Sequence, residues 1–145
     1  MWLDIGGLLV ILGPCTVLDI RKRKLPVIYL LVLLTAAFLT NLLMERLSVW
    51  EMALGILYGL AFLLVSILTK GAIGFGDGVM IASTGAWTGI FFVLPASILG
   101  FLSAGVFGLI YIKVRRLDRK TRLPFAPFLT GACLTLWALE LVTGG

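Results

Sequence analysis

The chain has 145 residues, of which 61% are hydrophobic and only 13% are charged, and its mean hydropathy is +1.14. A soluble domain of this length cannot bury so much apolar surface, so the composition excludes the soluble classes and predicts a membrane protein with several spans. The formal net charge of +5 is expected to come from loops that face anionic lipid, and no basic soluble segment points to nucleic acid as a partner.

Uncharged stretches define the predicted spans, which lie at residues 5–18, 25–44, 52–69, 78–112 and 123–139. A membrane-spanning helix needs about 17 to 25 residues. The 35 residues of 78–112 are too many for one helix and suffice for two, with Pro95 at their midpoint as the expected turn. The pattern therefore predicts an all-α bundle of six transmembrane helices.

The basic residues support this count independently. With residues 21–24 in the cytoplasm, six spans place eleven of the twelve Lys and Arg residues on that side and leave only Arg46 outside. This is the asymmetry that the positive-inside rule requires. A single kinked helix over 78–112 would move the basic cluster at 113–122 across the membrane. Both termini are therefore expected to be extracytoplasmic.

The first predicted helix, residues 2–19, is about 27 Å long and ends with Asp19 near the cytoplasmic surface. A basic loop follows, and Pro26 is expected to begin the second helix, where its missing N–H is not needed. The second helix ends near Met44, and a short external loop leads to a third helix that returns to Lys70.

Residues 71–78, Gly-Ala-Ile-Gly-Phe-Gly-Asp-Gly, interrupt this pattern and carry Asp77. Four glycines in eight residues disfavour helix, because each costs about 1 kcal/mol relative to alanine. Irregular backbone at this depth is tolerated only where protein or water covers its polar groups. Asp77 is therefore expected in a water-accessible site at the start of the fourth helix. The residues expected to support that site are Gly74, Phe75, Gly76 and Gly78.

Small residues four positions apart predict close packing between the later helices. The pairs are Gly55 with Gly59, Gly85 with Gly89, and Ala104 with Gly108. The two cysteines, Cys15 and Cys133, lie in apolar runs without a CxxC partner, so they are expected to be small buried side chains with no disulfide and no metal.

The side-chain inventory restricts the chemistry that such a site could perform. The chain has no histidine, which excludes Ser-His and Cys-His nucleophiles and HExxH zinc hydrolysis. Two carboxylates that share a proton suffice for aspartic hydrolysis without a cofactor. Asp19 and Asp77 are the acidic residues placed for it. From the pattern alone, two alternatives stay open: Asp19 pairs with Lys22 or Arg23, and Asp77 caps the fourth helix.

Four segments follow one another along the chain. They are Asp19 with the basic residues and Leu25-Pro26 after it, Gly74-Phe75-Gly76-Asp77, Gly85-Ala86-Trp87, and Leu123-Pro124-Phe125-Ala126-Pro127-Phe128. Together they resemble the signatures of the type IV prepilin peptidases, which are membrane aspartic proteases of bacteria with archaeal preflagellin relatives. The resemblance covers essentially the whole chain.

The resemblance implies that the protein cleaves the basic leader of prepilin-like or preflagellin-like precursors at the cytoplasmic face of a prokaryotic inner membrane. Asp19 and Asp77 are then the catalytic pair, and lipid is the other expected partner. The chain resembles the short form of the family, so residues 1–145 are expected to form a single peptidase domain without a soluble or methyltransferase domain. The oligomeric state is left open.

Three departures from the family pattern concern substrate contacts. Val79 stands where lysine is frequent, Val27 where a polar residue is common, and Ala126 where glycine is usual. The prolines near the expected site leave carbonyl groups without helical donors, and an extended substrate could pair with them; alternatively they are ordinary helix starts. The possible substrate-binding residues are Pro26, Pro124, Phe125, Pro127 and Phe128.

Two other functional classes use the same sequence features. A proton- or ion-coupled transporter could bind its ion with the two carboxylates beside a broken helix, although such proteins more often have a second broken helix in a repeated half. A non-catalytic assembly subunit would use the glycines only for packing. In the latter class Asp19→Asn and Asp77→Asn are expected to be harmless.

Overall fold

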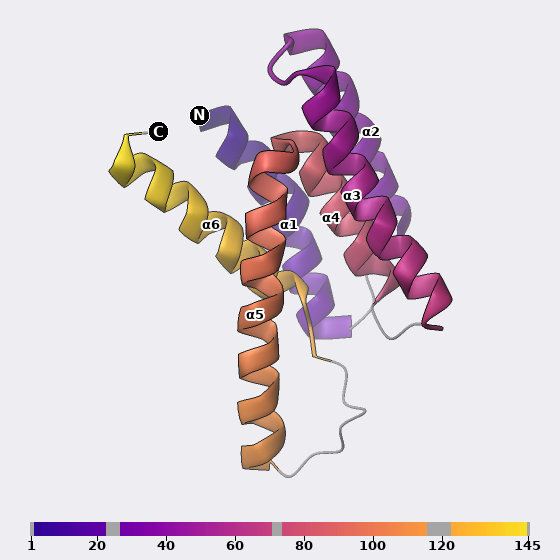
Figure 1. Ribbon diagram of the computed structural model, residues 1–145, viewed down its shortest axis with the longest axis vertical. Helices are drawn as coiled ribbons and strands as arrows, with labels where there is room; N and C mark the ends of the chain where they lie inside the picture. Colours follow the sequence, from indigo (N-terminus) through magenta and orange to yellow (C-terminus); the bar gives the residue numbers. More distant parts are fainter. Residues whose placement is uncertain (1, 23–26, 71–73, 116–122, 145) are drawn as a thin grey trace.

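The computed structural model describes residues 2–22, 27–70, 74–115 and 123–144. Within these ranges the chain forms six α-helices and no β-strand, which confirms the all-α prediction. The helices are α1 (Trp2–Lys22), α2 (Val27–Met44), α3 (Val49–Leu68), α4 (Phe75–Thr88), α5 (Ile90–Arg115) and α6 (Ala126–Thr143). Figure 1 shows α2 and α3 on one side of the molecule and α5 with α6 on the other, with α1 and α4 between them.

Four helices, α2, α3, α5 and α6, are long and apolar enough to cross a membrane. Large apolar side chains on their outer faces are exposed, for example Ile28, Leu68 and Leu109, as expected for surfaces that contact lipid. The length and apolar composition of these helices, together with the exposure of their outer side chains, support an integral membrane protein.

The short helix α4 is the centre of the bundle. Its 14 residues extend for about 21 Å, which is less than the hydrocarbon thickness of about 30 Å. It contacts α1, α2, α3 and α5, and every residue from 78 to 86 is buried. A helix that is covered on all sides in this way is positioned by its neighbours, so the location of Asp77 depends on how α4 is packed.

The turn between α4 and α5 lies at Gly89, so the prediction that Pro95 forms it is wrong. Gly89 has a φ of 79°, and its N–H donates to the carbonyl of Gly85 at 2.8 Å. Glycine adopts this left-handed conformation without a Cβ penalty. Pro95 instead lies in the second turn of α5. The division of 78–112 into two helices is correct, but the break comes six residues earlier.

Helices α3 and α4 pack backbone to backbone. A Cβ atom at Gly55 would lie 2.5 Å from the carbonyl oxygen of Gly85, and a Cβ at Gly85 would lie 2.5 Å from that of Gly55. Gly59 lies against the backbone of Ala82 in the same way. The predicted packing role of Gly55, Gly59 and Gly85 is therefore confirmed, whereas Gly89 serves the turn.

The carboxyl end of α4 is capped by a side chain from α2. The last carbonyl groups of a helix have no intrahelical donors, and they are costly to leave unpaired in apolar surroundings. Asn41 is almost completely buried, and its Nδ2 donates to the carbonyls of Ala86 at 2.5 Å and Trp87 at 3.4 Å. This contact fixes α4 at the end opposite to Asp77.

Candidate active site

Asp19 and Asp77 lie at the same end of the bundle. Helices α1 and α4 contact each other, and Figure 1 shows α1 ending toward the side of the molecule from which α4 starts. Cys15 and Met80 belong to one buried apolar cluster. Asp19 follows Cys15 by about one helical turn, and Asp77 precedes Met80 by about one turn. The two aspartates therefore each lie about one turn from a residue of this cluster, at the ends of α1 and α4 that point the same way.

Asp19 is buried and is held by the start of α6. Its Oδ2 accepts a hydrogen bond from the backbone N–H of Ala126 at 2.9 Å. In the first turn of α6, Pro127 has no N–H, and the N–H of Phe128 donates to the carbonyl of Phe125 at 3.0 Å. The N–H of Ala126 is thus left for an outside acceptor, and the positive end of the helix favours a carboxylate in that place.

The alternative in which Asp19 serves only to pair with its basic neighbours receives no support from this contact. Asp19 uses Oδ2 for Ala126, whereas the side chain of Lys22 is exposed. Arg23 lies outside the described residues. The hydrogen bond joins residues 107 positions apart in the sequence, so it fixes Asp19 relative to α6 and not merely to its own helix.

Asp77 is the third residue of α4 and is half-buried. Its N–H donates to the carbonyl of Gly74 at 3.1 Å. The N-cap position belongs to Gly74, so Asp77 lies within the first turn and is not the cap itself. An acidic residue there interacts favourably with the positive end of the helix.

Gly74 leaves room for the carboxylate of Asp77, and Gly78 lets α3 approach closely. A Cβ atom at Gly74 would lie 2.6 Å from Oδ2 of Asp77, so the carboxylate folds back over this glycine. A Cβ at Gly78 would lie 2.9 Å from the backbone nitrogen of Leu63. Phe75 is exposed at the edge of this region, and Gly76 is half-buried. The rest of the glycine segment, residues 71–73, lies outside the described residues.

The segment at the start of α6 is built into an aromatic stack. Phe125 is only 7% exposed, and its ring lies 4.4 Å from that of Phe101 at an interplanar angle of 18°. Phe101 stacks in turn on Phe62 of α3, with the ring centroids 5.2 Å apart. The structure thus places Phe125 in the packing that anchors the segment bound to Asp19. Its role in substrate binding stays a prediction.

The remaining residues of the predicted substrate site are more accessible. Phe128 is half-buried, with its ring 5.4 Å from that of Phe107. Pro124 is half-buried before α6, and Pro127 lies at the second position of the helix, which is a usual place for proline. Pro26 falls outside the described residues.

Sequence reasoning missed the second contact between α1 and α6. The hydroxyl groups of Thr16 and Thr130 are 2.7 Å apart, and each lies about one turn from the contact between Asp19 and Ala126. The sequence spacing could have indicated this contact. Thr16 and Asp19 are three residues apart, and Ala126 and Thr130 are four apart, so each pair lies on one face of its helix. Among the described residues, no group of three or more His, Cys, Asp or Glu side chains could hold a metal ion.

Comparison with known proteins identifies relatives of this chain. Residues 7–112, which include Asp19 and Asp77, match the sequence model of the type IV leader peptidase family. The chain is 35% identical to a prepilin leader peptidase/N-methyltransferase of Xanthomonas campestris over 52% of this chain and 27% of that protein. It is 27% identical to one of Aeromonas salmonicida over 97% of this chain and 54% of that protein.

A third relative with the same name, from Pseudomonas aeruginosa, is 29% identical over 87% of this chain and 46% of its own length. The chain therefore spans about half the length, or less, of these curated relatives. No solved structure matches it.

Proposed function

Because the chain belongs to the type IV leader peptidase family, we propose that it is a membrane aspartic endopeptidase that cleaves the basic leader of prepilin-like or preflagellin-like precursors. Asp19 and Asp77 are the catalytic pair in this proposal. What supports it is that Asp19 lies in the last turn of α1 and Asp77 in the first turn of α4, two helices that contact each other and run in opposite directions. The single core supports one peptidase domain.

The proposed reaction uses one proton shared between the two carboxylic groups. The ionised aspartate takes a proton from water, and the water oxygen attacks the scissile carbonyl carbon while the protonated aspartate donates a hydrogen bond to the carbonyl oxygen. The tetrahedral intermediate then collapses, the C–N bond breaks, and a proton passes to the leaving amine. The contact from Ala126 to Oδ2 of Asp19 leaves Oδ1 as the oxygen that exchanges the proton.

The proposed orientation places this site toward the cytoplasm, in the inner membrane of a prokaryote, with both termini outside. Described basic residues near this end of the bundle are exposed, namely Arg21, Lys22, Lys70, Lys113 and Arg115. Arg46 lies at the opposite end, in the turn between α2 and α3. The distribution supports the proposed orientation because basic residues favour the cytoplasmic side.

Substrate contacts are proposed for the two segments that flank the aspartates. Gly74 and the first turn of α4, with Phe75, Gly76 and Gly78, support Asp77 and admit the scissile segment. The exposed ring of Phe75 offers an apolar contact to that segment. The second segment consists of Pro124, Phe125, Pro127 and Phe128. Pro26, which lies outside the described residues, is proposed as a further substrate contact. No specific observation favours the transporter, since α4 is the one helix among those described that is too short to span the bilayer.

The test is cleavage of a prepilin-like peptide by the full chain reconstituted in lipid vesicles. Asp19→Asn and Asp77→Asn, made separately, should each lower the cleavage rate by at least about 100-fold, because each removes one of the two acid–base groups. The thermal unfolding temperature of both variants should stay close to that of the unchanged protein. Glu45→Gln, an exposed acidic residue outside the site, is the control. Cleavage that persists in either asparagine variant contradicts the proposal.

A further inference from the structure

A cavity of about 490 Å³ lies at the end of the bundle away from Asp19 and Asp77. Among its lining residues are Arg46, Glu51, Trp87, Phe91, Trp137 and Glu140. Trp87 follows Asp77 by ten residues and Glu140 follows Ala126 by fourteen, which correspond to about 15 Å and 21 Å along their helices. The cavity is therefore separate from the candidate active site.

The lining side chains combine charges of both signs with aromatic walls. The guanidinium of Arg46 lies 5.2 Å from the ring centroid of Trp87. The indole Nε1 of Trp137 is buried and has no acceptor among the described residues. Two carboxylates, Glu51 and Glu140, complete the charged set. The cavity thus offers donors to an anionic group and acceptors to a cationic one.

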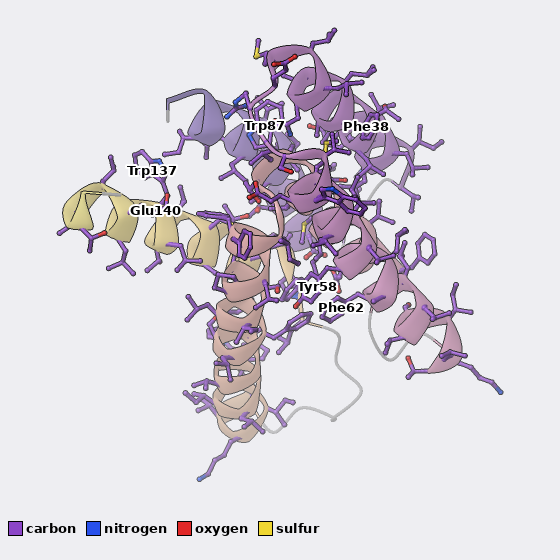
Figure 2. All side chains as sticks on the ribbon, turned by 45° about the horizontal axis from the view of Figure 1, so that its top comes forward. Phe38, Tyr58, Phe62, Trp87, Trp137 and Glu140 are labelled. Carbon is purple, nitrogen blue, oxygen red and sulfur yellow. The ribbon has the colours of Figure 1, made fainter. Side chains whose placement is uncertain are left out.

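The side chains come from segments that are far apart in the sequence. Figure 2 labels Trp87 on α4, and Trp137 with Glu140 on α6, which approach from two sides of the upper part of the molecule. Trp137 and Glu140 are three positions apart and so share one face of α6. Gly89, in the turn between α4 and α5, also lines the cavity. It lies beside Glu51, since a Cβ at Gly89 would be 3.5 Å from the Cβ of Glu51.

We propose that this cavity binds the head group of a zwitterionic membrane lipid that carries a primary ammonium, namely phosphatidylethanolamine. The phosphate accepts hydrogen bonds from the Arg46 guanidinium and the Trp137 indole N–H. The ammonium donates to Glu51 and Glu140 and lies against the aromatic walls. Tryptophan is also enriched at the level of lipid head groups.

The charge of the cavity selects among lipids. One guanidinium and two carboxylates give a formal charge of −1, which disfavours an anionic head group such as phosphatidylglycerol. A choline head group has no N–H with which to donate to the carboxylates. Phe91 lines the cavity and is 79% exposed, so it provides an apolar surface along which the acyl chains can continue from the head group.

Bound lipid would connect parts of the bundle that make little direct contact. The main neighbours of α6 are α1 and α5, whereas Arg46 and Glu51 belong to the turn before α3 and to its first residues. A head group held by Glu140 on one side and Arg46 on the other therefore joins α6 to α3. Lipid binding should consequently stabilise the bundle.

The test measures lipid occupancy on the purified full chain by native mass spectrometry. The protein is mixed with equal amounts of phosphatidylethanolamine, phosphatidylcholine and phosphatidylglycerol that have identical acyl chains. The first bound lipid should be phosphatidylethanolamine by about tenfold over each competitor, the ratio expected for one charge-assisted hydrogen bond. Equal occupancy of the three lipids, or a preference for phosphatidylglycerol, overturns the proposal.

Matched variants assign the preference to the cavity. Glu140→Gln keeps the size of the side chain but removes its charge, so it should reduce the preference severalfold. Trp137→Phe removes the indole N–H that contacts the phosphate shared by all three lipids, so it should lower the occupancy of each lipid severalfold and leave the preference unchanged. Glu45→Gln removes an exposed carboxylate that does not line the cavity and should change nothing. If Glu140→Gln and Glu45→Gln behave alike, the assignment is wrong.

Two further measurements distinguish a lipid site from a site for a soluble ligand and from the candidate active site. Glycerophosphoethanolamine, which has no acyl chains, should not displace the lipid at equal concentration; displacement would indicate a soluble ligand and overturn the lipid assignment. Asp19→Asn should bind phosphatidylethanolamine as the unchanged protein does, because the cavity lies away from Asp19. The lipid proposal thus succeeds or fails independently of proteolysis.

Discussion

The two aspartates are held by different kinds of interaction. Asp19 is positioned by hydrogen bonds between α1 and α6, through the N–H of Ala126 and the nearby pair of Thr16 and Thr130. Asp77 is positioned by the helix that carries it, because the backbones of α3 and α4 are in direct contact at Gly55 and Gly85. Hydrogen bonds fix the position of Asp19 directly, whereas the position of Asp77 depends on close packing elsewhere along α4.

Mutations at these two kinds of contact should reduce the free energy of unfolding by different amounts. A change in the polar contacts of Asp19 removes a small, local free energy, since a hydrogen bond between membrane helices contributes about 0.6 kcal/mol on average. A change at the crossing of α3 and α4 forces two backbones apart. Mutations at the crossing should therefore have larger effects than mutations of the polar contacts.

The largest effect is expected for Gly59→Leu in α3. Gly59 lies against the backbone of Ala82, so a leucine there must separate α3 from α4, at a cost of about 3 kcal/mol or more. Both the free energy of unfolding and the cleavage rate should fall. Gly105→Leu is the matched control, because nothing lies within 4 Å of a Cβ at that position of α5. Equal stability of the two variants would contradict the close packing of α3 on α4.

Gly74→Ala should affect activity more than stability. The backbone of Gly74 has a φ of −62°, which alanine adopts readily, but the added Cβ would lie 2.6 Å from Oδ2 of Asp77. A displacement of the carboxylate by about 1 Å should slow cleavage by about 100-fold. The unfolding temperature should barely change. Gly6→Ala, whose added Cβ meets nothing within 4 Å, should retain full activity.

The contact between Asp19 and Ala126 can be separated from the chemistry of Asp19. Asp19→Asn keeps an oxygen that can accept the N–H of Ala126, whereas Asp19→Ala leaves that buried N–H without its partner. The alanine variant should therefore be less stable than the asparagine variant by about 1 kcal/mol, as for the loss of a helix cap. Both should be inactive. Identical chemical or thermal stability of the two variants would show that the hydrogen bond contributes nothing.

The smallest effect is expected for Thr130→Val, which removes the contact with Thr16. Its cost should be about 0.6 kcal/mol, with cleavage lowered only slightly. Thr135→Val is the control, because the hydroxyl of Thr135 donates only within its own helix, to the carbonyl of Gly131 at 2.8 Å. A loss as large as that of Gly59→Leu would reverse the proposed ranking of the two regions.

Local features of the fold could be predicted from the sequence, and long-range contacts could not. Charge spacing predicted the six helices, and the glycine pairs that include Gly55, Gly59 and Gly85 predicted close helix packing but not which helices meet there. The turn after α4 was misplaced because proline is tolerated near a helix start, while a one-residue turn requires a positive φ that glycine supplies. Gly89 met that requirement.

At the candidate site, too, the sequence indicated the acidic residues but not their long-range contacts. The resemblance and the inventory of acidic residues singled out Asp19 and Asp77 from the sequence. The donor to Asp19 is the backbone N–H of residue 126. Because every residue except proline has a backbone N–H, the residue type at this position does not indicate the contact. Asn41, which caps α4, sits in an apolar run with no spacing pattern that connects it to residues 86 and 87. Such contacts depend on how the helices are arranged in space.

To act as a catalytic pair, Asp19 and Asp77 must approach closely enough to share a proton, and cysteine cross-linking tests this proximity most directly. In a chain with Cys15→Ala and Cys133→Ala, the pair Asp19→Cys and Asp77→Cys is treated with a short bifunctional thiol reagent and detected by intact mass. Thr16→Cys with Thr130→Cys is the positive control, since those hydroxyls are 2.7 Å apart. A shared proton predicts a cross-link in both pairs; a cross-link in the threonine pair alone would contradict it.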